Sequence, residues 1–204
     1  KVTDQALLNK LMMFLADNIG STTSPNSIGN ILSSEGDIDR GKGKSAGNVA
    51  GKTVDKYINM LKNAFIFYSV GRYDIKGKQF LKTLGKNYII DLGFRNMLLG
   101  YRDADRGHIL ENIVFLELIR RDYRVSIGKV GETEVDFVAE KPEEKIYIQV
   151  TETMKGEVVR ERELRPLKQI HDNYDKVVLS MDKSYIKSYE GIKVINIIDF
   201  LLEK

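Results

Sequence analysis

Hydrophobic residues in the first third of the chain recur with the period of amphipathic helices. Apolar side chains fall at helical spacing over residues 4–19, again from Pro25 onward, and again over about 53–64. Pro25 suits the start of the second helix, and Thr53, or a residue just before it, is expected to cap the third. The stretch between these helices, "EGDIDRGKGKSAGNVAGKT", is rich in glycine and charge and predicts an exposed, mobile loop.

That loop contains a short similarity to a phosphate-binding loop. Gly43-Lys44-Ser45 reproduces the last three residues of a Walker A motif. The motif also needs a glycine five positions earlier, where this chain has Ile38, and an apolar strand before the loop, which the sequence lacks. We therefore predict no nucleotide binding at this position.

Residues 65–81, "FIFYSVGRYDIKGKQFL", predict a β-hairpin, because aromatic and β-branched residues flank a charged tip that contains glycine. Three helices followed by a hairpin is the order of a winged helix-turn-helix, whose third helix can enter a major groove. We predict such a domain over residues 1–90. Six basic residues on or beside the third helix and in the wing could neutralise DNA phosphates: Lys52, Lys56, Lys62, Arg72, Lys76 and Lys78. An alternative of equal weight is a solvated face on a winged helix that contacts protein.

The pattern after residue 90 predicts a mixed α/β domain over residues 91–204. "NYIIDLGFRNMLLGY" indicates a short strand and a helix. The elements predicted after it are a helix at 107–121, strands near 123–128, 133–139 and 145–151, a helix at about 157–172, strands at 175–181 and 192–196, and a closing helix. Asn196 is the expected N-cap of the closing helix. Helices that alternate with strands around a central hairpin are typical of an α/β arrangement.

Charge is distributed unevenly over a chain whose net charge is only +3. Residues 1–90 carry 13 Lys and Arg against 7 Asp and Glu, whereas the remainder carries 19 against 22. A basic half joined to a slightly acidic half favours two modules with different functions.

The composition excludes several classes of site. The chain has no cysteine, so it has no disulfide, thiolate metal site or cysteine nucleophile, which agrees with a cytoplasmic location. The two histidines, His108 and His171, lack ligand spacing for zinc. No apolar run approaches the roughly 20 residues that span a bilayer, and no signal peptide is evident, so we expect no membrane partner. Because the chain begins at Lys1 and opens directly into an apolar pattern, we expect it to be part of a longer protein.

Glu111 stands out in the helix "GHILENIVFLELIRR", which is apolar nearly all round. In helical projection Glu111 falls among Leu118, Phe115 and Val114, whereas Glu117 projects well away from it. A carboxylate buried there needs a metal, a lysine or backbone donors as its partner. The alternative to a catalytic role is a structural hydrogen bond to a neighbouring loop.

The hairpin "TEVDFVAEKPEEKIYIQVT" has the outline of a metal-dependent nuclease site. Period-two alternation predicts that Asp136 shares a face with Glu134 and Val138, and lies beside Gln149 and Thr151 of the partner strand. Metal-assisted phosphodiester cleavage uses hard oxygen ligands for Mg²⁺ and a group that positions or activates water. Glu111 and Asp136 supply two carboxylates for Mg²⁺. Gln149 offers only a neutral oxygen, and Thr151 cannot replace an ammonium group.

Several segments together resemble the C-terminal region of a family of prokaryotic AAA-type ATPases. They are "KNYIIDLGFRN", "GHILENIVFLELIRR", "TEVDFVA", "IYIQVT" and "RERELRPL…IHDNYDKVVLSMD". Proteins of that family carry a P-loop ATPase, then a winged helix, then a domain of unknown function that is similar to the PD-(D/E)xK nuclease fold. The resemblance implies a restriction-endonuclease-like α/β fold for residues 91–204, with ATP bound only by an ATPase domain that precedes this segment.

The same resemblance implies roles for individual residues. Glu111 matches the glutamate of the first helix, Asp136 the aspartate of the first strand, and Gln149-Val150-Thr151 the (D/E)-x-K strand. Because Gln149 and Thr151 replace the carboxylate and the lysine, the implied site is degenerate.

The helix near residues 157–172 carries a second dense cluster of charge. Arg160, Arg162 and Arg165 could bind a phosphate backbone, or they could pair with the interleaved glutamates along a solvated helix. Pairing is the favoured interpretation.

Three functional hypotheses follow from the sequence. The leading one is a module that binds duplex DNA or a protein partner, with a degenerate nuclease-like site, in a longer ATPase that could form homo-oligomers. The second is a divergent DNA nuclease that depends on Mg²⁺ or Mn²⁺. The third is a platform for protein interactions alone.

Overall fold

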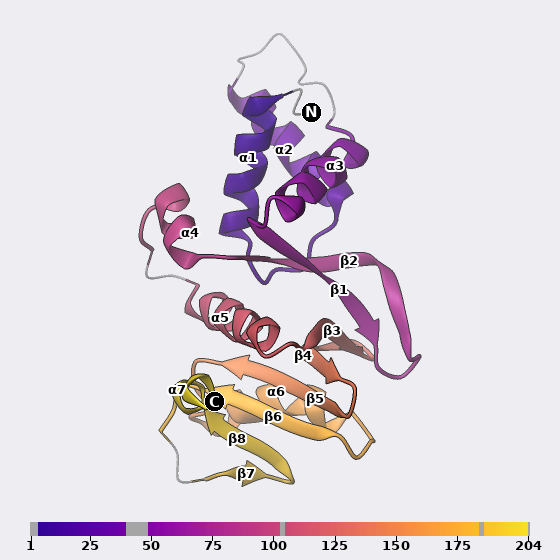
Figure 1. The fold of residues 1–204 in the computed structure, drawn as a ribbon, viewed down its shortest axis with the longest axis vertical. Helices are drawn as coiled ribbons and strands as arrows, with labels where there is room; N and C mark the ends of the chain where they lie inside the picture. Colours follow the sequence, from indigo (N-terminus) through magenta and orange to yellow (C-terminus); the bar gives the residue numbers. More distant parts are fainter. Residues whose placement is uncertain (1–3, 40–48, 103–104, 184–185, 204) are drawn as a thin grey trace. The chain divides into compact units, whose positions relative to one another are not determined.

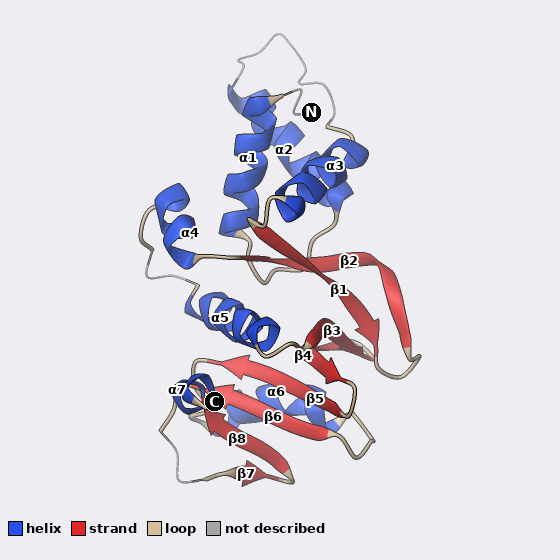
Figure 2. Ribbon diagram, in the orientation of Figure 1, coloured by secondary structure: helices blue, strands red, loops and turns tan. Residues whose placement is uncertain are grey.

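A computed structural model describes residues 4–39, 49–102, 105–183 and 186–203 of the chain. Its elements are, in order, α1 (Gln5–Asp17), α2 (Pro25–Asp39), α3 (Gly51–Asn63), β1 (Phe67–Asp74), β2 (Gln79–Ile89), α4 (Leu92–Leu99), α5 (Arg106–Arg120), β3 (Arg124–Val130), β4 (Thr133–Lys141), β5 (Glu144–Thr151), α6 (Glu157–Lys168), β6 (Asp175–Ser180), β7 (Ser188–Tyr189), β8 (Ile192–Asn196) and α7 (Ile197–Leu202). Figure 2 shows which segments are helix and which are strand. The predicted mixed α/β class is confirmed.

The chain divides into two compact units. Unit 1 contains Lys1–Ser69 and Leu84–Arg102, and unit 2 contains Val70–Thr83 and Asp103–Lys204. The base of the β1–β2 hairpin thus belongs to unit 1 and its tip to unit 2 (Figure 1). This division differs from the predicted boundary between residues 90 and 91, because β1 also pairs with a strand that the sequence pattern did not connect to it.

The three predicted N-terminal helices are confirmed, with two corrections at their ends. Residues 35–39, expected in a loop, continue α2, while residues 40–48, which include Gly43-Lys44-Ser45, lie outside the described part of the chain. Thr53 lies inside α3 rather than at its cap: the N-cap is Ala50, with extended backbone and no capping side chain. Gly51 starts α3 at a point where this helix lies close to α2. A Cβ atom at position 51 would lie 1.9 Å from the Asn26 Oδ1 atom.

Unit 1 encloses a core between α1, α2 and α3. Its fully buried members include Leu11, Leu15, Tyr57 and Phe67. Arg95 of α4 is also buried, at 1% exposed, and its Nε donates to the carbonyl oxygen of Ala16 over 2.8 Å. That bond satisfies one carbonyl at the C-terminal end of α1 and joins α4 to this helix.

Unit 2 is built on a mixed sheet. The strand order of the whole sheet is β2-β1-β3-β4-β5-β6-β8-β7. β1 pairs with β3 in parallel, β3–β4 and β4–β5 are antiparallel, and β5–β6 and β6–β8 are parallel. The predicted hairpin at the centre of the domain is confirmed as β4 and β5, and Asn196 is confirmed as the N-cap of α7, where its Oδ1 accepts from the Ile198 N–H over 2.9 Å.

Helices cover both faces of this sheet. On one face, Leu164 and Leu167 of α6 share a core with Val138 and Tyr147. On the other, α5 packs Phe115 against Phe137 with ring centroids 6.2 Å apart. In Figure 1, α5 and α6 lie apart from each other, and α6 is seen behind the strands of the sheet. The neighbouring β4 residues Phe137 and Val138 therefore pack on opposite faces of the sheet.

Glu117 joins α5 to the C-terminal helix α7 through Arg121. The Glu117 carboxylate is 9% exposed and accepts from Arg120 Nε over 2.7 Å and from Arg121 Nε over 2.6 Å. The hydrogen bond from Arg120 is the largest cause that lowers the pKa of Glu117 from 4.5 to about 2. Arg121 also donates to the carbonyl oxygens of Phe200 and Glu203 and lies 4.4 Å from the Phe200 ring centroid.

Replacement of Glu117 by glutamine should reduce stability and flatten its acid dependence. Because the pKa is lowered in the folded state, the ionised carboxylate stabilises the fold above pH 4.5 and loses this effect as the pH falls toward 2. We expect Glu117→Gln to lower the free energy of unfolding at pH 7 by up to about 3 kcal/mol and by much less at pH 2.5. Urea denaturation at both pH values measures this. Glu161→Gln, on the exposed face of α6, is the control, and equal losses in both variants would contradict the assignment.

Candidate functional site

A β-bulge in β4 sets the direction of Asp136. Ser126 pairs with Val138 and Gly128 with Val135, so that Asp136 and Phe137 together lie opposite the single residue between them in β3. Val135 and Val138 consequently both join the core under α6. The predicted period-two alternation, with Asp136 and Val138 on one face and Val135 on the other, is therefore wrong at this point.

The Asp136 carboxylate occupies a position in the backbone ladder between β4 and β5. Regular pairing of the two strands ends at Phe137 opposite Ile148. Beyond it, Asp136 Oδ2 accepts from the Val150 N–H over 2.9 Å, and Asp136 is only 9% exposed. A hydrogen bond from a backbone N–H to a buried carboxylate stabilises its ionised form.

Glu111 lies buried in α5, as the helical projection predicted. It is 6% exposed, and its Oε2 lies 3.9 Å from Nδ1 of His108, one turn earlier. The sequence had assigned no role to His108. An imidazole in this position carries a positive charge only when protonated, so its attraction for Glu111 depends on pH.

Gln149 and Thr151, which match the (D/E)-x-K strand, are both engaged elsewhere. Gln149 Nε2 donates to Glu163 Oε2 of α6 over 3.3 Å, while its buried Oε1 has no hydrogen-bond partner among the described residues. Thr151 Oγ1 donates to the Thr153 carbonyl oxygen over 3.1 Å. Both residues thus have partners other than Glu111 and Asp136.

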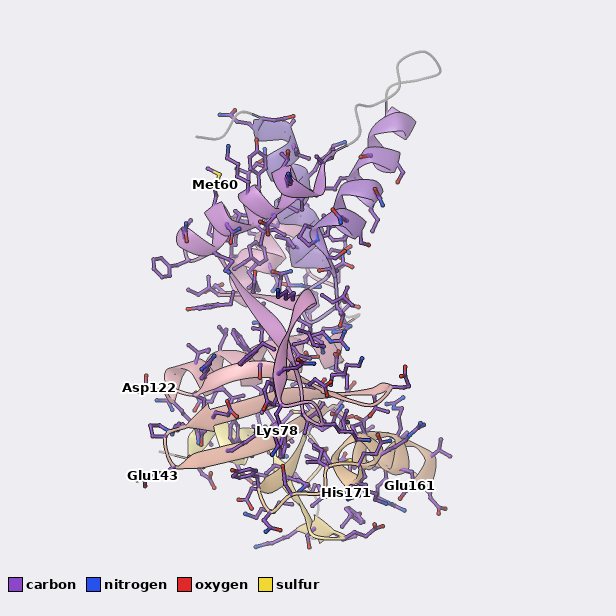
Figure 3. The ribbon with its side chains drawn as sticks, turned by 90° about the vertical axis from the view of Figure 1, so that its right-hand side faces the viewer. Met60, Lys78, Asp122, Glu143, Glu161 and His171 are labelled. Atoms are coloured by element: carbon purple, nitrogen blue, oxygen red, sulfur yellow. The ribbon has the colours of Figure 1, made fainter. Side chains whose placement is uncertain are left out.

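A cavity of about 790 Å³ opens beside Gln149. It is lined by α6, by the turn after it and by the ends of β4 and β5, and Figure 3 labels two of its lining residues, Glu161 and His171. Of the four predicted catalytic residues, all of which lie in the described part of the chain, only Gln149 is among those that line the cavity. The described residues also contain no group of three or more His, Asp and Glu side chains placed to hold a metal ion.

Glu163 is a buried carboxylate that the sequence analysis did not single out. It is 6% exposed, and its Oε1 accepts from Arg162 Nε over 2.9 Å and Nη2 over 2.7 Å. A usable signal was present: Glu163 precedes Leu167 by four residues and therefore shares the apolar face of α6. For Arg162 the structure agrees with the favoured interpretation that these arginines pair along the helix.

The six predicted nucleic-acid contacts fall into two groups. Lys52 and Lys56 are exposed on α3 of unit 1, and Lys62 is half-buried near the end of that helix. The other three belong to the hairpin tip in unit 2: Arg72, Lys76 and Lys78.

The hairpin tip makes polar contacts with β4 and within its own turn. Arg72 Nε lies 3.4 Å from Glu134 Oε2, and its side chain is 15% exposed. Lys76 and Lys78, the latter labelled in Figure 3, are exposed. Lys76 lies in the turn itself, where Asp74 Oδ1 accepts from the backbone N–H groups of Lys76 and Gly77. Arg72 therefore already has a carboxylate partner, whereas both lysines face solvent.

Comparisons with known proteins show the family of this chain. Residues 1–105, just over half of the chain, match the family model described as "Domain of unknown function (DUF8612)". The chain belongs to this family. An uncharacterised protein of Haemophilus influenzae is 38% identical over 202 residues, which cover 99% of this chain and 47% of that protein. This chain thus spans about half the length of the curated relative it matches, and no solved structure matches it.

These comparisons name neither an ATPase nor a nuclease, so both resemblances stay predictions. Among the residues that the structure describes, no helix combines the length and the apolar character needed to cross a bilayer.

The role of Asp136 as a ladder acceptor is testable by two substitutions at that position. Asp136→Ala leaves the buried Val150 N–H without its acceptor and should lower the free energy of unfolding by about 2 kcal/mol. Asp136→Asn keeps a side-chain oxygen that can accept the same hydrogen bond from Val150. It should therefore lower the free energy of unfolding by less than half as much as Asp136→Ala does. Urea denaturation compares the two, and an equal loss would show that the hydrogen bond to Val150 is unimportant.

Proposed function

We propose that this chain is a module that binds duplex DNA, with α1, α2, α3 and the β1–β2 hairpin acting as a winged helix-turn-helix. The observation that carries this proposal is the division of α3 into two faces. Val54, Tyr57, Ile58 and Leu61 are buried in the core of unit 1. The opposite face exposes Lys52, Lys56 and Asn59 to solvent.

The exposed face of α3 has the residue types that DNA recognition uses. Lysines neutralise phosphates and set the orientation of a helix on the duplex. An asparagine amide can pair with the edge of adenine in the major groove. Asn59 Nδ2 donates to Asp55 Oδ2 over 3.3 Å, so the amide is held on this face one turn after its acceptor. Asp55 is the one acid of α3, against three lysines.

The contribution of the wing is smaller in this proposal than the sequence predicted. Arg72 lies beside Glu134, and this partner offsets its attraction for a phosphate. Lys76 and Lys78 stay exposed and supply a second set of cations. The lysines of α3 therefore carry the main electrostatic contribution.

The nuclease-like hairpin has the role of a scaffold in this proposal. In support, Gln149 Nε2 donates to Glu163, Thr151 Oγ1 donates to Thr153, and Gln149 alone of the four predicted catalytic residues is among those that line the cavity. The alternative, a nuclease that uses Glu111 and Asp136 with Mg²⁺ or Mn²⁺, predicts nicking of plasmid DNA that Asp136→Asn abolishes. We expect plasmid to stay intact with either metal.

The module would act in a longer protein. The resemblance to AAA-type ATPases implies that ATP binds in a separate domain, and the Haemophilus relative is about twice as long as this chain. We propose that ATP binding elsewhere in the full protein controls when the module contacts DNA. Homo-oligomerisation of the longer protein would then present several α3 helices to one duplex.

Loss of the two exposed lysines of α3 should weaken DNA binding in a salt-dependent manner. If Lys52 and Lys56 each contact one phosphate, the variant with both replaced by alanine should reduce the slope of log K against log salt by about 2. Fluorescence anisotropy with a labelled duplex between 50 and 200 mM salt, concentrations in the usual range for such titrations, measures this.

The matched control is the double variant Lys183→Ala and Lys187→Ala, which removes the same charge from exposed positions of unit 2. We expect its slope to equal that of the unaltered chain. An equal change in both double variants would indicate that net charge alone determines binding, and the absence of DNA binding by the unaltered chain would overturn the proposed function.

A further inference from the structure

The turn that ends α3 places a phenylalanine where glycine is normally found. The Ile66 N–H donates to the Leu61 carbonyl oxygen over 3.0 Å, and the Phe65 N–H donates to that of Lys62 over 2.9 Å. This pair of bonds defines a Schellman turn with Phe65 at its left-handed position, and φ of Phe65 is 56°. A bulky side chain in this conformation is strained relative to glycine.

The Phe65 ring gives little stability in return for this strain. It is 69% exposed, whereas Leu61 before it and Phe67 after it are 3% and 1% exposed. The backbone around it is fixed, because Ile66 packs against the core of unit 1 and its carbonyl oxygen accepts from the Ile90 N–H over 3.1 Å. Phe65 is thus a large apolar side chain that projects into solvent from a fixed backbone.

A second turn of the same kind shows that the geometry does not demand an aromatic residue. At the end of α5, the Tyr123 N–H donates to the Leu118 carbonyl oxygen and the Asp122 N–H to that of Ile119, each over 3.0 Å. Asp122 takes the left-handed position there, with φ of 62°. Aspartate adopts this conformation more readily than phenylalanine does. The ring at Phe65 therefore calls for an explanation outside the turn.

We propose that Phe65 is an apolar wedge that contacts a base step of the duplex bound by α3. This inference rests on the proposed DNA binding and deepens it. Over residues 59–64, Asn59, Asn63 and Ala64 are exposed, Met60 and Lys62 are half-buried, and Leu61 is buried. Phe65 is therefore the one exposed large apolar side chain between Gly51 and Ile66. An exposed ring with two amides and a cation nearby in the sequence fits an insertion between bases, flanked by groups that contact the sugar-phosphate backbone.

The polar neighbourhood argues against a protein partner as the occupant. Aromatic anchors of protein interfaces sit in well-packed apolar patches that exclude water, whereas Asn59 and Asn63 keep this end of α3 hydrated. A wedge instead needs a rigid backbone, because unstacking a base step is costly and a turn that is already ordered loses no further backbone freedom on insertion. The turn supplies that rigidity.

Substitution of Phe65 separates this role from folding. Phe65→Gly relieves the left-handed strain and should raise the midpoint of thermal unfolding, while it lowers affinity for duplex DNA about tenfold and removes the protein-induced bend. Phe65→Trp keeps an aromatic wedge and should retain the bend. Asp122→Gly changes the matching turn of α5 and should leave the bend unaltered.

The measurement is the distance between dyes at the two ends of a duplex with a central TA step, by energy transfer, alongside anisotropy. A variant that is more stable yet neither bends DNA nor binds it tightly supports the wedge. If the unaltered chain binds DNA but does not bend it, or if Phe65→Gly binds and bends as well as the unaltered chain does, the wedge is overturned and the proposed DNA binding stands. If the unaltered chain does not bind duplex DNA at all, the proposed function fails, and the wedge with it.

Discussion

Burial of one face of α3 is the constraint on which the rest of unit 1 depends. Tyr57, at the centre of that face, is 1% exposed, and its hydroxyl accepts from the backbone N–H of Asp4 over 3.0 Å. Asp4 in turn caps α1 by accepting from the Leu7 N–H over 2.9 Å. Since Val54 and Leu61 are buried on the same side, rotation of α3 about its axis would expose apolar surface. The direction of Lys52 and Lys56 toward solvent is therefore a consequence of the core.

In unit 2 the corresponding constraint is the bulge in β4. An extra residue shifts Val138 and Val135 into one core and directs Asp136 into the gap between β4 and β5, where the Val150 N–H needs an acceptor. The carboxylate then has a structural partner whether or not a metal binds. Asp136 therefore has a structural role that does not depend on Gln149 or Thr151, both of which make contacts of other kinds.

Local pattern predicted the elements well because amphipathic period and cap chemistry are properties of short segments. The three N-terminal helices, the β4–β5 hairpin and the Asn196 cap each follow from residues within one short continuous segment. The pairing of β1 with β3 joins residues more than 50 positions apart and leaves no such signal. The bulge was missed because strict alternation is the default for a strand, and nothing in "TEVDFVA" marks the inserted residue.

Prediction of the candidate site was less complete for a related reason. Burial of Glu111 followed from its apolar neighbours in projection, but the partners of a buried charge come from other elements. The sequence did not predict which residues would pair with these buried carboxylates and with Gln149. The structure pairs His108 with Glu111, Glu163 with Gln149, and both Arg120 and Arg121 with Glu117. The exposed face of α3 was predictable because exposure there is simply the complement of a helical apolar stripe.

The most direct test of the account is the change in backbone amide chemical shifts of the full chain on addition of a short DNA duplex at low salt. We predict that the largest changes fall on α3, from Lys52 to Asn63, and on the turn at Phe65, with smaller changes at Lys76 and Lys78. Changes confined to α6 and to the cavity beside Gln149, with α3 unaffected, would contradict the claim that α3 is the DNA-binding surface.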